Sequence, residues 1–532
     1  MYSWEIIKYS NHSPPRYLSK NFGEILIFFN GKSEMMSSMS RLFIGMILLA
    51  SITSSQASQS SVITVGQQGC DFYRIEAAID SAGPGDIIEV QSGEYNVNLN
   101  ITTPLLTLRG KDTGNGRPVL KAGSSTADIE QSGSGMTEMA VKSGGTAIAL
   151  REFGCVVDGF AITGITWPVP YDSGEHNDLI GNAGIRVYSD GNTISNNTFY
   201  GSDLTAIGLW NCSNNRIINN TIKDIPFGYG VELYNSHGNT IEGNFLLHND
   251  WGIEMQRSDS NTIEANEITD SINDAIRAVK CNFSIISGNT ITGSGWESEY
   301  EGNGNGIYLT GSMGGITGNL ISSNRCYGIY IESIFWNNYP ADESYDNFIY
   351  GNKIRGNGKD GICLVKSWQN SLWNNNITAN HGDGISFDFS HNNTAESNNI
   401  SKNQHGILLH QSNYTRIANS TIMDEAKCGI LLEQSCTGNA LAANLVSNST
   451  QGINISGGSY ANAVFGNNLT GNSQPAWDGG ANSWDKEGKG NYYGHPDCRD
   501  LNSDGICDSP YPIAGGSSVD RYPLASWMRM PG

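Results

Sequence analysis

The sequence predicts an all-β protein that folds as a single parallel β-helix, a stack of coils with three short strands and about 22 residues each. Two repeated motifs predict this fold. A Gly-Ile-x-apolar motif, or a close variant, recurs twelve times, and an apolar-x-x-Asn-x-apolar motif follows each copy about ten residues later. The composition agrees, because 64 Gly residues and only 16% charged residues favour frequent turns over helices.

Three apolar columns define the strands of each coil. Successive copies of the first column lie 22 to 24 residues apart, except for two spacings of 31 and 33 residues. One repeat is too small to bury these residues, whereas stacked repeats bury them against the coils on either side. Leucine-rich repeats would need a Leu-x-x-Leu-x-Leu motif, which this sequence does not repeat. The first column comprises Ile185, Ile207, Val231, Ile253, Ile276, Ile307, Ile329, Ile362, Ile385, Ile407, Ile430 and Ile453.

An Asn stands between the second and third columns in eleven of the twelve coils, from Asn197 to Asn467, and Ser420 is the substitute. Asn tolerates the left-handed backbone of a tight bend, and its amide can bond the copy on the next coil. We therefore expect a ladder of Asn side chains at one bend of each coil.

The chain divides into four segments. Residues 1–57 contain an upstream extension and a signal peptide, residues 58–150 the N-terminal cover and first coils, and residues 151–475 the repeats. Residues 476–532 depart from the repeat and predict an irregular C-terminal cover. Both covers are expected because the open ends of a β-helix leave strands unpaired.

The N-terminal cover contains one predicted helix. An amphipathic pattern over Phe72–Ala82 places Ile75, Ala78 and Ile79 on one face. A strand at Val62–Val65 precedes this helix, and strands at 87–90 and 105–108 follow it as early coils.

The export signal rests on the one long apolar run, Leu42–Ala50. Arg41 precedes it, and small residues ending at Ala57 follow it, which is the arrangement of a secretory signal peptide. The run is too short to span a bilayer, and no second apolar segment follows. An uncleaved anchor is the alternative. We expect a secreted, periplasmic or cell-surface protein with no transmembrane segment in the mature chain.

The charge excludes some partners. The net charge is −21, with a pI near 4.8. A protein this acidic, without a basic stripe, repels nucleic acid and anionic membrane surfaces. We expect a monomer.

Several motifs together resemble one known family. They are Phe72-x-x-Ile75-x-x-Ala78-Ile79-x-x-Ala82-x-Pro84-Gly85-Asp86, Gly93-x-Tyr95, the twelve repeats, Gly490-Asn491-Tyr492-Tyr493, Pro510-Tyr511-x-Ile513 and Asp520-Arg521-Tyr522-Pro523. They resemble the NosD-like right-handed β-helix family of the pectin-lyase-like fold. The resemblance implies a right-handed helix, and repeats of the kind found in carbohydrate-binding and sugar-hydrolysing proteins. It also implies a role in copper maturation. The sequence lacks a Met- or His-rich tract, which argues against that role.

Residues at one offset of successive coils form columns on the surface of a β-helix. The outward position after the first apolar column places a charged and aromatic run on consecutive coils. The candidate catalytic residues are Glu232, Glu254, Arg277, Tyr308 and Tyr330. The next outward column contains the aromatic residues Tyr188, Trp210 and Tyr234, which can stack on sugar rings.

Three long insertions flank this surface. Long loops on a rigid repeat are usually functional, and these would form the walls of a groove over the candidate catalytic residues. Their candidate substrate-binding residues are Trp167, Trp296, Tyr300 and Trp336.

Three functions fit these residues. The first is polysaccharide binding with lyase, hydrolase or epimerase activity, in which the two Glu bind a cation or act as acid and base, Arg277 neutralises a uronate and a Tyr donates a proton. The second is a non-catalytic carbohydrate-binding or envelope scaffold, in which Glu254 and Arg277 are a surface ion pair. The third is the copper accessory role.

Two candidate metal sites stand apart from this surface. The C-terminal segment resembles the first nine positions of a Ca²⁺ loop and lacks the final Glu, so the alternative is a turn held by Cys498 and Cys507. Its candidate ligands are Asp500, Asn502, Asp504, Ile506 and Asp508. A weaker transition-metal candidate consists of two stacked sets, Asp388, His410 and Glu433, and Asp383, His405 and Cys428.

Overall fold

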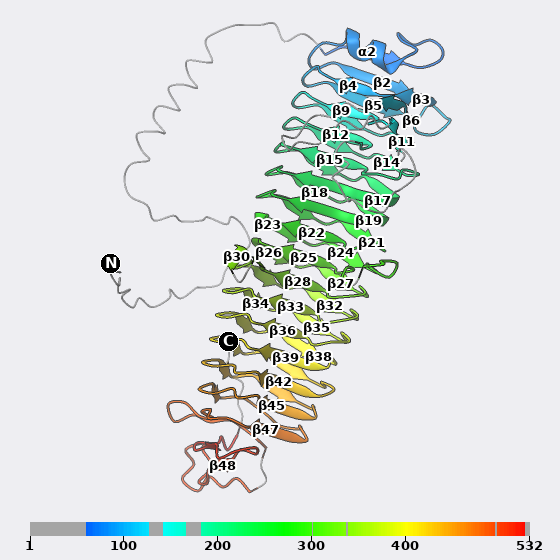
Figure 1. The fold of residues 1–532 in the computed structure, drawn as a ribbon. Coiled ribbons are helices and arrows are strands. Elements are labelled where there is room, and N and C mark those ends of the chain that lie inside the picture. Colours follow the sequence, from blue (N-terminus) through cyan, green and yellow to red (C-terminus); the bar gives the residue numbers. More distant parts are fainter. Residues whose placement is uncertain are drawn as a thin grey trace, which may run out of the picture. The chain divides into compact units, whose positions relative to one another are not determined.

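The computed structural model describes residues 60–126, 142–165, 182–300, 302–336, 339–494 and 497–526. The predicted signal peptide lies outside the described residues. Residues Ser60–Gly532 form one compact unit. Figure 1 shows that unit as a stack of coils, and its large sheets contain parallel pairings throughout. The structure therefore confirms a nearly all-β, right-handed parallel β-helix.

The second strand of each coil contributes to a sheet of 16 strands. Its members in order are β1 (Val62–Val65), β2 (Ile87–Gln91), β5 (Thr107–Lys111), β10 (Val156–Asp158), β13 (Thr193–Ser195), β16 (Arg216–Ile218), β18 (Thr240–Glu242), β20 (Thr262–Glu264), β23 (Asn282–Ser287), β26 (Met313–Thr317), β31 (Phe348–Tyr350), β34 (Ser371–Trp373), β37 (Thr394–Glu396), β40 (Arg416–Ala418), β43 (Ala440–Ala442) and β46 (Ala463–Phe465).

The first strand of each coil forms a second row. Its members are β4 (Leu99–Ile101), β9 (Ile148–Leu150), β12 (Ile185–Val187), β15 (Ile207–Trp210), the ends of β17 (Thr221–Tyr234) and β19 (Phe245–Gln256), β22 (Ile276–Val279), β25 (Ile307–Thr310), β28 (Ile329–Glu332), β33 (Ile362–Val365), β36 (Ile385–Asp388), β39 (His405–His410), β42 (Cys428–Glu433), β45 (Gln451–Ile455) and β47 (Gln474–Asp478).

The third strand forms the remaining row. Its members are β3 (Glu94–Val97), β6 (Val119–Ala122), β11 (Ala161–Thr163), β14 (Thr198–Phe199), the beginnings of β17 and β19, β21 (Glu267–Thr269), β24 (Thr290–Thr292), β27 (Leu320–Ser322), β32 (Lys353–Arg355), β35 (Asn376–Thr378), β38 (Asn399–Ser401), β41 (Thr421–Met423) and β44 (Leu445–Ser447). Because β17 and β19 run on from the third row into the first, these two rows form one sheet of 27 strands. The three rows can be followed in Figure 1.

The three apolar columns form the core. Ile307, Ile316 and Ile321, one from each strand of a single coil, are completely buried, and no member of the three predicted columns is more than 2% exposed. The first column pairs in register from coil to coil, as Ile276 does with Ile307 and Ile307 with Ile329. Stacking thus buries what a single coil cannot, and the column prediction is confirmed.

The predicted Asn ladder is present. The amide of Asn352 donates to the Oδ1 atom of Asn375 at 3.0 Å, and Asn375 donates to Asn398 at 3.0 Å. The left-handed residue is the one before each ladder position, as in Asn374 with φ of 55°. The expectation that the ladder Asn itself takes the left-handed conformation was therefore wrong, because its side chain must point inward to reach its neighbour.

Two further Asn-rich ladders lie at other bends, and the sequence analysis missed both. One of them contains Asn192, Asn215, Asn239 and Asn261, joined by hydrogen bonds of 3.0 to 3.1 Å between their side-chain amides. The other contains Asn324, Asn357, Asn380 and Asn403, joined at 2.9 to 3.0 Å. This third ladder continues to a buried glutamate, Glu425, whose Oε2 atom accepts the N–H of Asn403 at 2.6 Å. At these ladder positions the buried backbone N–H groups thus find partners, as those of Asn215 and Asn357 do in the Asn side chains of the next coil.

The N-terminal helix covers the first coils and is shorter than predicted. Helix α2 spans Ile75–Ser81 and buries Ile75, Ala78 and Ile79 as expected. It begins after Phe72 because that residue makes a parallel bridge with Val65 and Arg74 is extended. The strand predicted at 105–108 begins at Thr107, since Leu105 has a φ of 61° and cannot continue a strand.

The C-terminal segment continues the stack before it becomes irregular. Strand β47 pairs in parallel with β45, and an isolated parallel bridge joins Asn468 to Tyr492. The antiparallel pair β48 (Tyr511–Pro512) and β49 (Val519–Asp520) follows. The buried carboxylate of Asp520 accepts the N–H of Asn491 at 2.7 Å and the hydroxyl of Tyr493 at 3.0 Å. These bonds hold the irregular cover on the last coil.

Two smaller antiparallel hairpins project from the stack. One consists of β7 (Ser124–Thr126) and β8 (Lys142–Gly144), and the other of β29 (Ile334–Trp336) and β30 (Tyr339–Asp342). In the part of the chain that the structure describes, we found no helix long and apolar enough to cross a membrane.

The cysteines behave differently from one another. Cys498 and Cys507 form a disulfide with an S–S distance of 2.01 Å. The other eight are free thiols, and all of them except Cys70 are buried. Cys428 and Cys436, which are also near in sequence, are not bonded to each other.

Candidate functional site

The predicted outward column lies on consecutive strands of the first row. Glu232 on β17 is the register partner of Glu254 on β19, Glu254 of Arg277 on β22, and Arg277 of Tyr308 on β25. Tyr308 in turn pairs with Tyr330 on β28. The structure therefore brings the five candidate catalytic residues into one line, with neighbours separated by one coil, about 4.8 Å.

Two ion pairs dominate this line. Arg186 bonds Glu232 at 3.3 Å across the small residue Gly208, and Arg277 bonds Glu254. In each pair one side chain is buried and the other is partly exposed: Arg186 and Glu254 are 2% exposed, whereas Glu232 and Arg277 are 20% and 29% exposed. We call Arg186, Glu232, Glu254 and Arg277 the Arg–Glu face. The side chains of this face that a ligand can reach are the partly exposed Glu232 and Arg277.

Aromatic rings surround the two guanidinium groups. The Arg186 guanidinium lies 4.8 Å from the ring centre of Trp210, and Trp210 stacks on Tyr234 at 4.9 Å. The Arg277 guanidinium lies 5.2 Å from the Trp251 ring and 5.5 Å from the Tyr308 ring. Such contacts hold each cation in place, and the partly exposed Arg277 keeps an edge that can bond a ligand.

Tyr308 and Tyr330 share one carboxylate. The Tyr308 hydroxyl donates to Glu332 at 2.6 Å, and the Tyr330 hydroxyl donates to the other oxygen of Glu332 at 3.0 Å. Burial is the main cause that raises the pKa of both tyrosines above the usual range, and the Glu332 carboxylate acts in the same direction. Both hydroxyls are therefore protonated at neutral pH.

Three residues of this site escaped the sequence analysis, namely Tyr229, Asp250 and Trp251. They lie two or three residues before the first apolar column, where β17 and β19 run without a break past the bend. Burial raises the pKa of Asp250 to about 7, and the nearby Glu254 acts in the same direction. The signal in the sequence that could have located this part of the site is the aromatic residue directly before the Gly of the repeat, as in Tyr229 and Trp251.

The Glu232 carboxylate has an unusual environment. Burial raises its pKa above the usual range, Arg186 opposes this effect, and the charge of Glu254 adds to it. A carboxyl group whose pKa is raised toward neutrality can exchange a proton with a bound substrate.

The insertion between β24 and β25 packs along the bend beside the Arg–Glu face. Its Trp296 donates from Nε1 to the carbonyl of Ser323 at 2.8 Å and remains 64% exposed. Tyr300 is also exposed. Glu297 reaches back to His248 at 3.2 Å, and His248 also contacts Asp224 at 3.1 Å. These contacts keep the loop against the coils.

The remaining predicted binding residues have separate surroundings. Tyr188 lies beneath the Arg151 guanidinium, 4.8 Å from the ring centre. Trp336 lies in the β29–β30 hairpin, and its side chain is outside the described part of the structure. Trp167 also lies outside the described residues.

The two sets proposed as transition-metal ligands form hydrogen-bonded pairs. His405 contacts Asp383 at 2.7 Å, and His410 contacts Glu433 at 3.2 Å with Asp388 at 3.9 Å. Within the described ranges, no group of three or more His, Cys, Asp or Glu side chains is arranged to hold a metal ion.

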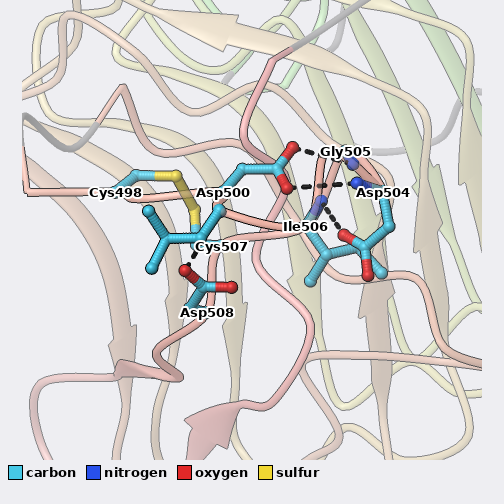
Figure 2. Close-up of a disulfide and its surroundings, with 8 residues drawn as sticks. Cys498, Asp500, Asp504, Gly505, Ile506, Cys507 and Asp508 are labelled. Atoms are coloured by element: carbon cyan, nitrogen blue, oxygen red, sulfur yellow. Dashed lines mark hydrogen bonds between the residues drawn. A yellow bond between two sulfur atoms is a disulfide. The ribbon is translucent and has the colours of Figure 1, made fainter.

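The C-terminal loop is closed by the disulfide (Figure 2). The Asp500 carboxylate accepts the N–H groups of Asp504 and Gly505 at 3.1 and 2.9 Å, and Asp504 accepts the N–H of Ile506 at 2.9 Å. The Asp508 carboxylate turns to the N–H of Leu501 at 3.1 Å. The loop is thus a compact turn that carries oxygen donors.

Comparisons with known proteins complete the description of the site. The family model described as "Periplasmic copper-binding protein (NosD)" matches residues 173–359 and 336–498, more than half of the chain. No curated protein sequence matches this chain significantly.

Among solved structures, the A-module of the mannuronan C-5 epimerase AlgE4 of Azotobacter vinelandii is 17% identical, with 72% of this chain and 93% of that chain covered and a TM-score of 0.42. A double mutant of the periplasmic alginate epimerase AlgG is 15% identical, with 58% and 75% covered and a TM-score of 0.39. A rhamnogalacturonan lyase is 12% identical, with 60% and 82% covered and a TM-score of 0.39.

Proposed function

The chain belongs to the NosD family, and from this premise we propose that it is an exported β-helix protein that binds an extended, carboxylate-bearing polysaccharide across its Arg–Glu face. The observation that carries the proposal is the partly exposed Arg277 guanidinium, held between Trp251 and Tyr308. A fixed guanidinium bonds a planar carboxylate through two N–H groups, and the adjacent rings offer surfaces for sugar stacking.

The rest of the face fits the same ligand. Glu254 is buried beneath Arg277 and accepts a hydrogen bond from Gln256 at 3.0 Å, so it positions the guanidinium. Trp210 and Tyr234 stack as a second aromatic surface on neighbouring coils. Because the coils repeat about every 4.8 Å along one direction, an extended chain can meet several of these groups at once.

A second candidate function is acid–base chemistry on the bound uronate. The raised pKa of Glu232 favours it, and the protonated hydroxyls of Tyr308 and Tyr330 lie three and four coils further along the same line. Lyase and epimerase reactions both begin by removing a proton from the carbon that bears the carboxylate, and Arg277 would stabilise the charge that develops there. Product analysis with Glu232→Gln separates turnover from binding, since this change keeps the shape of the side chain.

We expect Arg277→Gln to reduce the affinity for polygalacturonate or polymannuronate at least tenfold, because the charge-assisted bond to the sugar carboxylate is lost. Trp210→Ala should weaken binding by about 1–3 kcal/mol through lost stacking. Titration calorimetry measures both effects. Tyr414→Ala is the control, because Tyr414 is 64% exposed and lies on a distant coil. Equal affinity of the wild-type protein for a uronan and its carboxyl-reduced form would refute the proposal.

Copper does not fit the described residues. Among the described residues, no free thiol belongs to a group of three or more His, Cys, Asp or Glu side chains that could hold a metal ion. The thiols of Cys428 and Cys436 donate to backbone carbonyls at 3.1 and 3.2 Å. We therefore assign no copper chemistry to this part of the chain.

We also propose that the C-terminal loop binds Ca²⁺, since its donors are the hard oxygens that this ion prefers. Binding would draw the carboxylates of Asp500 and Asp504 away from the loop amides and onto the ion. A chelator should then lower the melting temperature of the wild-type protein and leave that of Asp504→Ala unchanged. Identical wild-type melting curves with and without chelator would leave the loop as a disulfide-closed turn.

A further inference from the structure

An exposed aromatic cluster lies on the 16-stranded sheet, away from the Arg–Glu face. Phe348 and Tyr350 on β31 and Trp373 on β34 are 40%, 38% and 48% exposed. The Phe348 and Tyr350 rings lie 5.6 Å apart with an angle of 9° between their planes, and the Tyr350 and Trp373 rings are also 5.6 Å apart. We call these three residues the aromatic strip. Figure 1 shows β34 in a different row from the strands of the candidate site.

The neighbours of the strip on the preceding coils are uncharged, whereas on the following coil Glu396 is the register partner of Trp373. Gly315 on β26 is the register partner of Phe348, and a Cβ atom added to it would meet nothing within 4 Å. The surface beside Phe348 is therefore open at that point. The outward positions of the four strands β23, β26, β31 and β34 are Ile285, Ser287, Gly315, Thr317, Phe348, Tyr350, Ser371 and Trp373.

The same two columns are charged on the coils to either side. Glu242 and Glu264 precede the uncharged segment, and Glu396 and Arg416 follow it. Charged and small polar residues are what an exposed sheet normally carries, since they prevent unwanted association. The four strands with uncharged outward positions and three exposed rings thus differ from the rest of this sheet.

We propose that the aromatic strip is a second sugar-binding site, which takes an uncharged saccharide. Aromatic rings stack on the C–H faces of sugars, while small hydroxyl side chains such as Ser371 and Thr317 bond the ring hydroxyls. The segment has no cation to pair with a uronate, in contrast to the Arg–Glu face. Tyr350 and Trp373 lie on adjacent coils, so successive sugar units can meet successive rings.

A second copy of the chain fits this surface less well. The net charge of −21 makes two copies repel one another, and an uncharged strip offers no compensating ion pairs. A saccharide without charge meets no such electrostatic repulsion.

The test is titration calorimetry of the full chain with cellohexaose, xylohexaose and mannohexaose. We expect at least one of these neutral hexaoses to bind, and Trp373→Ala to weaken its binding about tenfold or more. Raising the salt concentration should leave the affinity unchanged, because the hexaoses carry no charge. Arg277→Gln should bind the hexaose as the wild-type protein does, which separates this site from the proposed uronan site.

Tyr460→Ala is the matched control, because Tyr460 is 54% exposed and lies outside the strip. Phe348→Ser provides a second variant if Trp373→Ala unfolds. Wild-type affinity in both Trp373→Ala and Phe348→Ser would overturn the proposal, as would the lack of binding of every hexaose at concentrations of about 10 mM. A dimer in sedimentation that Trp373→Ala converts to monomer would instead assign the strip to self-association.

Discussion

Replacing Asn375 by alanine should lower the free energy of unfolding by about 3–5 kcal/mol, one of the two largest effects expected in this protein. The Asn375 side chain is 1% exposed and makes four hydrogen bonds. Its Oδ1 atom accepts the backbone N–H and the amide of Asn352, both at 3.0 Å. Its amide donates to the carbonyl of Ile349 at 2.9 Å and to Asn398 at 3.0 Å. Alanine would leave these buried partners unsatisfied on two coils.

Urea denaturation of Asn375→Ala and the wild-type protein measures this loss. Asn376→Ala is the control, because the neighbouring Asn376 is exposed and makes one weak ladder contact, accepting from Asn399 at 3.3 Å. We expect the control to change stability by less than about 1 kcal/mol. Equal losses in the two variants would mean that the ladder does not stabilise the stack.

Glu425→Gln is expected to stabilise the protein above neutral pH. Glu425 is 3% exposed, and its Oε1 atom has no hydrogen-bond partner among the described residues. Burial raises its pKa from 4.5 to about 7, and the charges of Asp424 and Asp383 act in the same direction. The folded state therefore holds a proton that the unfolded state releases near pH 4.5. Stability falls as the pH rises from about 4.5 to about 7, because the folded state binds more protons in that range.

The size of this effect follows from the two pKa values. A difference of about 2.5 units corresponds to at most about 3 kcal/mol at pH 8. Glutamine keeps the shape and cannot ionise, so the stability gain should be present at pH 8 and vanish near pH 4.5. Denaturation curves at the two pH values measure it, with Glu264→Gln, an exposed carboxylate on β20, as the control. A gain of equal size at both pH values would show that charge is not the cause.

The register of the coils could be read from the sequence, because hydrophobic positions must coincide when coils stack. The columns that begin at Ile185 and the line from Glu232 to Tyr330 follow directly from that constraint. Periodicity also located the Asn ladder, since one residue type recurs there.

The rest depends on side-chain directions that periodicity does not carry. Arg186 reaches across Gly208 to Glu232, two coils away, and no repeat pattern predicts which member of an ion pair lies underneath. The other two ladders were missed because they mix Asn with Ser, Thr and Glu. Tyr229 and Trp251 were missed because the uninterrupted strands β17 and β19 carry the sheet past a bend where the repeat predicted a turn.

The buried thiols have a consequence for oxidative folding. Thiol–disulfide exchange requires a thiolate, and burial raises the pKa of Cys281 and of Cys428 to about 12. Once the coils close, these sulfurs are neither ionised nor reachable, whereas Cys498 and Cys507, nine positions apart in the chain, form a disulfide. Mispairing of the buried thiols is therefore confined to the interval before each coil docks on the last, and the order of docking along the chain decides how long each of them stays at risk.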